Sequence, residues 1–174
     1  MVNWEKLKNP DGPFTPFVPN SPTDIEFWHK VTRFESMVSK KYLFASDDCR
    51  DLKTVQGIMK MYLLGGACNI FYEVGDFGGL VGFTNIKEGD KATMIVKVWS
   101  KRVFTKDNVR SFMELARTYV DEFKLRRLSM DTAHRKFARL AETAGMTIEG
   151  VMKKDFKWGG RYYDRYLLAL YGEE

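Results

Sequence analysis

The stretch TKDNVRSFMELARTYVDEF, residues 105–123, predicts the clearest helix of this 174-residue chain. Thr105, Asp107 and Asn108 cluster at its start, where capping and the helix dipole favour such side chains. Its apolar residues follow offsets 0, 3, 4, 7, 11 and 14, which form one wide stripe on a helix: Val109, Phe112, Met113, Ala116, Val120 and Phe123. A helix with such a stripe needs an apolar surface to cover, and the sequence on both sides predicts a sheet.

Strand-like runs precede and follow this helix. Residues 68–74, 79–86 and 92–98 are separated by turn residues at 75–76 and 88–90, which predicts an antiparallel meander. After the helix we expect a strand at 127–131, a helix closed by Gly145, and two strands at about 147–154 and 162–170. Two further helices are expected before the meander, one from Thr23 or Asp24 to Val38 and one from Leu52 to Leu63. The order predicts one mixed α/β domain.

The composition excludes several classes of protein. Hydrophobic residues make up 44% and charged residues 29%, which suits one compact domain and argues against global disorder. The apolar run at 167–171 is far shorter than the roughly 18 residues of a membrane span. Cys49 and Cys68 are too few for a disulfide framework and lack metal-type spacing. The start of the chain lacks the apolar block of a secretory signal. We therefore expect a cytoplasmic protein without membrane contact or a bound metal.

All five prolines lie near the start, at positions 10, 13, 16, 19 and 22. Polyproline II has three residues per turn, so this spacing puts every proline on one edge of an extended rod. The sequence therefore predicts a proline-rich arm over residues 1–22, followed by a single domain over residues 23–174. Residues 10–22 either pack along their own domain or dock on a second subunit, as a homodimer, or on another protein.

Positive charge gathers in the second half of the chain. Between residues 100 and 139 there are eleven basic and five acidic residues, a local net charge of +6 against +5 for the whole chain. This charge suits a phosphate-bearing partner, either a nucleotide cofactor or nucleic acid, although a solvated helix face is the alternative. Aromatic residues and Arg161 and Arg165 alternate in the last predicted hairpin. They could stack on nucleobases, or form core or a dimer edge.

Two C-terminal stretches carry a family resemblance. Residues 139–151, RLAETAGMTIEGV, and residues 160–164, GRYYD, resemble the GNAT acyl-CoA N-acyltransferases, especially the branch that acetylates ribosomal proteins and protein amino termini. With the predicted element order, the resemblance covers roughly residues 24–171. It implies a mixed, mostly antiparallel sheet of six to seven strands, flanked by about four helices.

The resemblance also implies a co-substrate, acetyl-CoA, and a primary amine as acceptor. In this family the fourth and fifth strands splay apart and the pantetheine arm enters the gap, which corresponds here to Lys97 and Val98. The pyrophosphate rests on backbone N–H groups at the start of the following helix. The matching residues are Arg102, Val103, Phe104, Thr105 and Lys106.

The chain departs from the family pattern at two places. Val103 and Thr105 occupy the glycine positions of the phosphate loop, where a side chain crowds the approach and a positive φ becomes costly. We expect Arg102 and Lys106 to compensate by charge. The tyrosine that protonates the leaving thiolate in many members corresponds to Ala141. His134 is then the candidate acid or cofactor contact, or else a solvated histidine.

The amine must lose a proton, so a carboxylate base is expected. Glu73 on a meander strand and Asp76 just after it are the candidates, with a solvated strand-end acid as the alternative. Three functions follow in order of preference: an N-acetyltransferase, a catalytically silent GNAT-like assembly module, and a nucleic-acid-binding protein.

Overall fold

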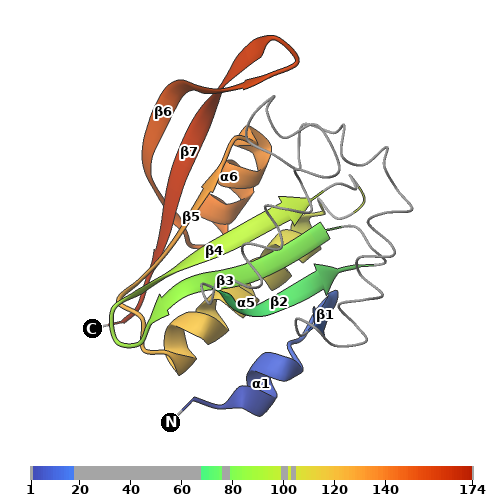
Figure 1. Cartoon of the computed structure of the whole chain (residues 1–174), viewed down its shortest axis with the longest axis vertical. Coiled ribbons are helices and arrows are strands. Elements are labelled where there is room, and N and C mark those ends of the chain that lie inside the picture. Colours follow the sequence, from blue (N-terminus) through green and yellow to red (C-terminus); the bar gives the residue numbers. More distant parts are fainter. Residues whose placement is uncertain (1, 18–67, 76–78, 99–101, 103–104, 174) are drawn as a thin grey trace.

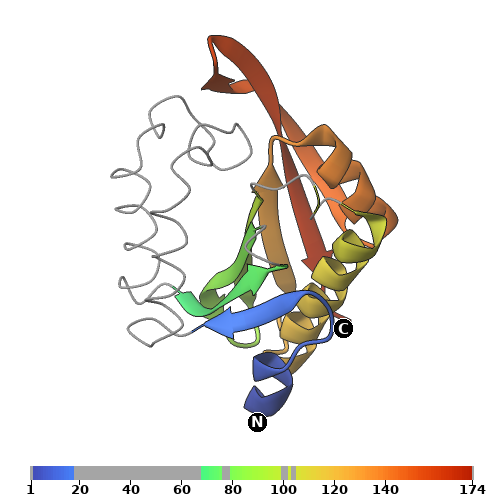
Figure 2. The same cartoon turned by 90° about the vertical axis from the view of Figure 1, so that its right-hand side faces the viewer.

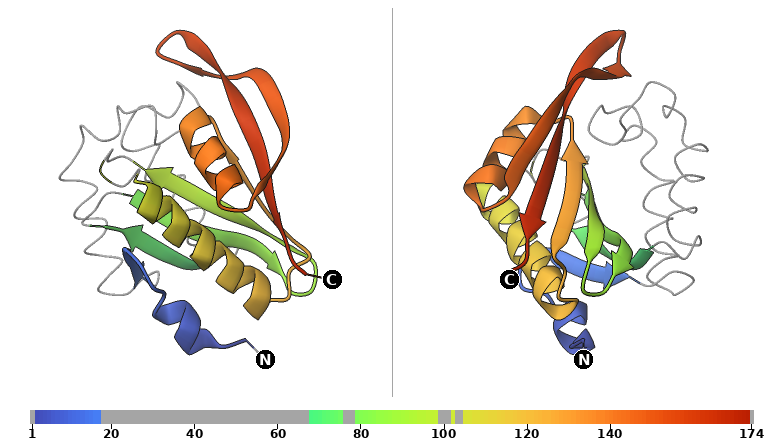
Figure 3. Two further views of the ribbon diagram at one scale, coloured as in Figure 1. Left: turned by 180° about the vertical axis from the view of Figure 1, so that it is seen from behind. Right: turned by 90° about the vertical axis from the view of Figure 1, so that its left-hand side faces the viewer.

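The computed structural model describes residues 2–17, 68–75, 79–98, 102 and 105–173, and these form one seven-stranded sheet (Figure 1). The strand order is β1-β2-β3-β4-β5-β7-β6, in which only β4 and β5 are parallel. Helices α5 and α6 lie side by side on one face of this sheet (Figures 2 and 3). The elements are α1 Trp4–Lys8, β1 Phe14–Phe17, β2 Cys68–Val74, β3 Gly79–Lys87, β4 Lys91–Val98, α5 Lys106–Glu122, β5 Arg127–Thr132, α6 Arg135–Thr143, β6 Thr147–Trp158 and β7 Arg161–Tyr171.

This architecture confirms the predicted fold class: a mixed, mostly antiparallel sheet with the meander, the central helix and the final hairpin in the expected order. The described ranges contain three helices. The two helices expected before residue 64 and the boundary expected at residue 22 lie outside these ranges. No helix in the described ranges is long and apolar enough to cross a membrane.

The first residues of the chain belong to the sheet, so the polyproline rod is a wrong prediction for residues 14–17. Strand β1 pairs antiparallel with β2, with Phe14 opposite Val74 and Pro16 opposite Tyr72. A proline cannot donate to a ladder, but β1 is the edge strand, where one side makes no ladder bonds. The described part of the N-terminus thus packs along its own domain. A partner contact through residues 10–22 stays a prediction.

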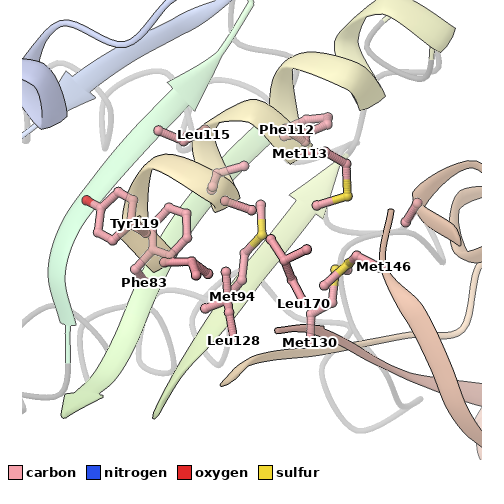
Figure 4. Close-up of a cluster of buried hydrophobic side chains, with 14 of the residues drawn as sticks. Phe83, Met94, Phe112, Met113, Leu115, Tyr119, Leu128, Met130, Met146 and Leu170 are labelled. Carbon is pink, nitrogen blue, oxygen red and sulfur yellow. The ribbon is translucent and has the colours of Figure 1, made fainter. Parts of the chain in front are cut away.

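The core lies between the sheet and the buried stripe of α5 (Figure 4). Tyr119 of α5 stacks on Phe83 of β3, with ring centroids 3.5 Å apart and planes 5° apart. The Tyr72 hydroxyl donates to the carbonyl oxygen of Leu7 at 2.6 Å, so in its 2.9 Å bond with the Tyr119 hydroxyl it accepts. These bonds satisfy two buried hydroxyls, and the first of them fastens α1 to the sheet.

Candidate functional site

The sheet divides between β4 and β5. Their parallel ladder contains three residue pairs, from Lys91 opposite Arg127 to Thr93 opposite Ser129. Beyond these pairs β4 stays paired with β3 as far as Val98, and β5 stays paired with β7 as far as Thr132. The two strands therefore diverge towards their carboxyl ends, as Figure 1 shows, while each remains tied to its own half of the sheet. We call the gap between their diverging ends the split.

Methionines fill the core on the helix side of the split. Met94 and Met130 directly follow the last paired residues of β4 and β5, and both are buried. Met113 of α5 and Met146, between α6 and β6, belong to the same cluster (Figure 4). A flexible thioether side chain adapts to an irregular space better than a branched one does. The sequence analysis missed this methionine cluster, which we call the methionine floor of the split. Its signal was a methionine on each of two adjacent strands and on the helix between them.

Both helix starts lie at the carboxyl ends of these two strands. Thr105 caps α5: its Oγ1 accepts from the N–H of Asn108 at 3.1 Å, and its carbonyl oxygen accepts from the N–H of Val109 at 3.1 Å. The N–H groups of Lys106 and Asp107 precede the first intrahelical bond, so they face the helix end. Together with the helix dipole and the exposed cations of Arg102 and Lys106, they favour an anion, whereas Asp107 opposes one.

The Thr105 backbone corrects one expectation. Its φ is −95° and its ψ is 160°, in the extended region open to any residue. Threonine at this family glycine position therefore carries no backbone strain, and its hydroxyl provides the cap instead. Val103 and Phe104 lie outside the described residues.

His134 caps the second helix, α6. Its Nδ1 accepts from the backbone N–H of Phe137 at 3.4 Å, and the backbone N–H of His134 donates to Oγ1 of Thr132 at 3.1 Å. A nitrogen that accepts a hydrogen bond carries no proton, so in the capped state the ring proton is on Nε2. The ring is half-buried and stands at the end of β5. Its role as an acid or a cofactor contact stays a prediction.

One carboxylate candidate, Glu73, lies in the other half of the sheet. Glu73 is half-buried on β2 between the buried residues Tyr72 and Val74, which pack towards α5. Side chains alternate along a strand, so Glu73 is on the face opposite α5. It pairs with Leu80, which pairs with Lys97, so the backbone of Lys97 is two strands away, about 10 Å at ~4.8 Å per strand. Asp76 lies outside the described residues.

Ala141 supplies no acid at this site. It is fully buried on α6, on the face that also buries Phe137 and Ala138. Among the described residues, no group of three or more His, Cys, Asp or Glu side chains could hold a metal ion.

Solved structures share this architecture. Spermidine N-acetyltransferase from Vibrio cholerae, solved in complex with CoA and spermine, superimposes with a TM-score of 0.64 at 17% identity, covering 92% of this chain and 96% of that one. A Salmonella typhimurium acetyltransferase that modifies the N-terminal serine of ribosomal protein L7/L12 gives 0.61 at 16% identity over 92% and 96%. A GNAT acetyltransferase from Bacillus anthracis gives 0.61 at 17% over 86% and 91%. No protein-family model and no curated protein matches the chain. The likenesses show the GNAT fold.

Proposed function

We propose that this chain, which has the GNAT fold, is an N-acetyltransferase that moves the acetyl group of acetyl-CoA to a primary amine. The observation that carries the proposal is the split, with the capped start of α5 at the carboxyl end of β4. Diverging parallel strands offer backbone groups to an extended ligand, and a helix start offers N–H groups to a phosphate. The solved neighbour with CoA and spermine supports this choice of ligand.

We assign two parts of the co-substrate to positions near the split. The pantetheine arm would lie along the β4 backbone at Lys97 and Val98, where that strand has parted from β5. The pyrophosphate would rest on the N–H groups that follow Thr105, with Arg102 and Lys106 beside it. In this proposal Val103 and Phe104 complete the phosphate loop.

The chemistry is one acyl transfer. The amine nitrogen attacks the thioester carbonyl carbon, the C–S bond breaks, and the products are an N-acetyl amide and a CoA thiolate, which takes a proton from solvent. Glu73 receives the amine proton through water, because its row in the sheet is about 10 Å from β4. Asp76 is the other candidate base.

His134 serves the leaving group as a hydrogen-bond donor. Its Nδ1 caps α6, which holds the ring at the end of β5, next to the split, where we assign it to the thioester or the departing sulfur. An alkyl thiol of the cysteine type ionises near ~8.5, so its thiolate can leave without an acid at position 141. The acceptor is a small amine or a protein amino terminus.

The second candidate, a silent GNAT-like module, is favoured by Ala141, which is buried and carries no proton donor. Calorimetric titration with acetyl-CoA, with desulfo-CoA as a control, separates the two functions. We expect both compounds to bind at micromolar concentrations. We also expect the variant Arg102→Ala/Lys106→Ala to bind about tenfold or more weakly, since two phosphate-directed cations are lost. The matched variant Lys91→Ala/Lys124→Ala, which loses the same charge elsewhere, should bind like the wild type. No heat with either compound contradicts the enzyme proposal.

Catalysis is tested in an amine screen with Glu73→Gln. We expect kcat to fall by about 10²-fold or more while KM for acetyl-CoA stays unchanged, because the carboxylate acts on the amine. An unchanged kcat would remove Glu73 from the mechanism.

A further inference from the structure

The hairpin of β6 and β7 extends beyond the rest of the sheet (Figures 1 and 2). The pairing of β7 with β5 ends where Tyr166 meets Thr132, so residues 161–165 pair with β6 alone. Gly159 and Gly160, with φ values of 56° and 73°, make the tight turn at its tip. We call residues 151–165 the ribbon.

The ribbon is basic, and its two acidic side chains bond to other groups of the ribbon. It contains five basic and two acidic residues. Asp164 accepts from the backbone N–H of Lys154 and from Lys153 Nζ, both at 3.0 Å, which closes the bulge between Met152 and Phe156. Asp155 pairs with Arg165 at 2.6 Å. Lys154, Lys157 and Arg161 are exposed and form no ion pair with any described residue.

An exposed aromatic ring lies beside one of these cations, Lys157, while Arg161 is on the other face of the ribbon, next to the turn. Tyr162 is 61% exposed, the highest value among the exposed large hydrophobic residues of the described part. It is directly opposite Lys157 across the two strands, and the Lys157 ammonium lies 5.8 Å from its ring centroid. On the other face of the ribbon Phe156 is buried and stacks on Tyr163 at 5.2 Å. The ribbon thus has a packed aromatic pair on one face and a solvent-exposed cation–aromatic pair on the other.

These features restrict the partner. The net charge of +3 on the ribbon opposes its association with a second copy of itself. Addition of a strand to the outer edge of β6 is hindered by the bulge and by three lysines, which are the usual protection of an edge strand. A cationic surface with an exposed ring has the chemistry that holds single-stranded nucleic acid, phosphates on the cations and a base on the ring.

We propose that the ribbon is a binding surface for single-stranded nucleic acid. Lys157 contacts a phosphate beside Tyr162, which stacks on one base, and Lys154 and Arg161 contact the neighbouring phosphates from the bulge and from the turn at the tip. From Lys154 to the end of β6 the strand spans about 13 Å at ~3.3 Å per residue. Phosphates of an extended single strand lie farther apart than the ~3.4 Å per strand along a duplex axis, so this length holds about three phosphates, one for each cation. This inference is independent of the proposed acetyl transfer.

Fluorescence anisotropy with a fluorescein-labelled oligothymidylate of about 20 nucleotides tests it on the full chain. Three phosphate contacts predict a slope of log K against log salt near about −2, which is a loss of about 20-fold between about 50 and 200 mM salt. Lys154→Glu/Lys157→Glu/Arg161→Glu should lose at least that factor. The control Lys8→Glu/Lys91→Glu/Lys124→Glu has the same charge change in α1, at the start of β4 and after α5, at the opposite end of the molecule (Figure 1). It should bind within about twofold of the wild type.

The tyrosine gives the second measurement. Tyr162→Ala should weaken binding by about 5-fold to 150-fold, and Tyr162→Phe, which keeps the ring, should restore it. Equal losses in the two charge variants would overturn the proposal, as would displacement of the oligonucleotide by CoA, which would place it at the helix starts. Competition by polyglutamate at equal charge, with no effect of Tyr162→Ala, would assign the ribbon to an acidic polypeptide instead.

Discussion

The sheet has two halves, one on either side of the split, and different interactions stabilise the inside of each half. In β1 to β4 the contacts are buried aromatic rings: Tyr72, Phe83 and Tyr119 meet under the meander. In β5, β7 and β6 a buried apolar core is joined by charged pairs at the surface, where Arg127 and the Tyr171 hydroxyl both bond to Glu149. Packing responds little to pH and salt, whereas exposed ion pairs respond to both. The first half should therefore be the less sensitive to solution conditions.

Among the described residues, few polar contacts join the two halves of the sheet at the surface. Besides the three ladder pairs, Ser129 Oγ donates to the carbonyl oxygen of Ala92 at 3.2 Å. Asp90, in the β3–β4 turn, accepts from Arg126 Nη2 at 3.0 Å, and its carbonyl oxygen accepts from the N–H of Arg127. All of these contacts are at the closed end of the split.

The largest expected effect is the loss of the ring at Tyr119. Tyr119→Ala should lower the free energy of unfolding by about 3–5 kcal/mol, because it empties the stack on Phe83. Tyr119→Phe removes the hydroxyl alone and should cost about 1 kcal/mol, since the Tyr72 hydroxyl keeps the Leu7 carbonyl as its acceptor. Urea unfolding measures both. If the two variants lost equal stability, ring packing would not be what holds the first half.

The second-largest loss of stability is expected where the β4–β5 ladder joins the two halves of the sheet. Ser129→Ala removes the side-chain bond to Ala92 and should cost about 1 kcal/mol in the same urea titration. Hydrogen exchange should speed up for the amides of the β4–β5 ladder and stay unchanged inside the β2–β3 pair. Faster exchange throughout the meander would show that the halves do not open separately.

A smaller effect is expected at the charged end of the second half. Arg127→Ala should cost at most about 1 kcal/mol in low salt, because the pair with Glu149 is partly exposed and screened. The difference from the wild type should shrink in about 1 M salt, where charges are screened within ~3 Å. For Tyr119→Phe the difference should not change with salt. A salt-independent loss in Arg127→Ala would assign its role to packing of the side-chain stem.

The smallest expected effect is a change in how the thermal stability depends on pH in the acid range. Hydrogen bonds from Arg127 and then Tyr171 hold the pKa of Glu149 below its usual value, and the backbone N–H of Lys154 and then Lys153 do so for Asp164. A lowered pKa in the folded state gives stability that is present above the unfolded values, about 4.3 and 3.9, and lost as the pH falls through the folded ones. The Tm of Glu149→Gln/Asp164→Asn should therefore fall less than that of the wild type between about pH 5 and pH 3. Parallel curves would contradict this account.

The sequence predicted the elements whose pattern is periodic. The stripe of α5, its Thr105 cap and the turn at Gly89 follow from local rules, and the structure confirms them. Strand β1 was missed because its four residues contain Pro16, which local rules exclude from a sheet, while tertiary pairing permits it at an edge. Helix α1 has five residues, too few for a period to show.

The candidate site was less predictable, because its geometry depends on pairs distant in sequence. No local pattern shows that the β4–β5 ladder ends at Thr93, or that Glu73 falls in one row with Lys97. The role of His134 as a cap follows from its position at the start of α6, once the end of β5 is known. The bulge closed by Asp164 gives a structural reason for the GRYYD sequence that carried the family resemblance.

The methionine floor makes the split observable by spectroscopy. The chain has nine methionines, and four of them, Met94, Met113, Met130 and Met146, are buried in the core beneath the diverging strands. Labelling the methionine ε-methyl groups with ¹³C would place reporters under the position proposed for acetyl-CoA without altering any residue. Met152, 44% exposed on the ribbon, adds a fifth reporter at the other proposed surface. One methyl spectrum would then distinguish a ligand in the split, which shifts the first four signals, from one on the ribbon, which shifts that of Met152.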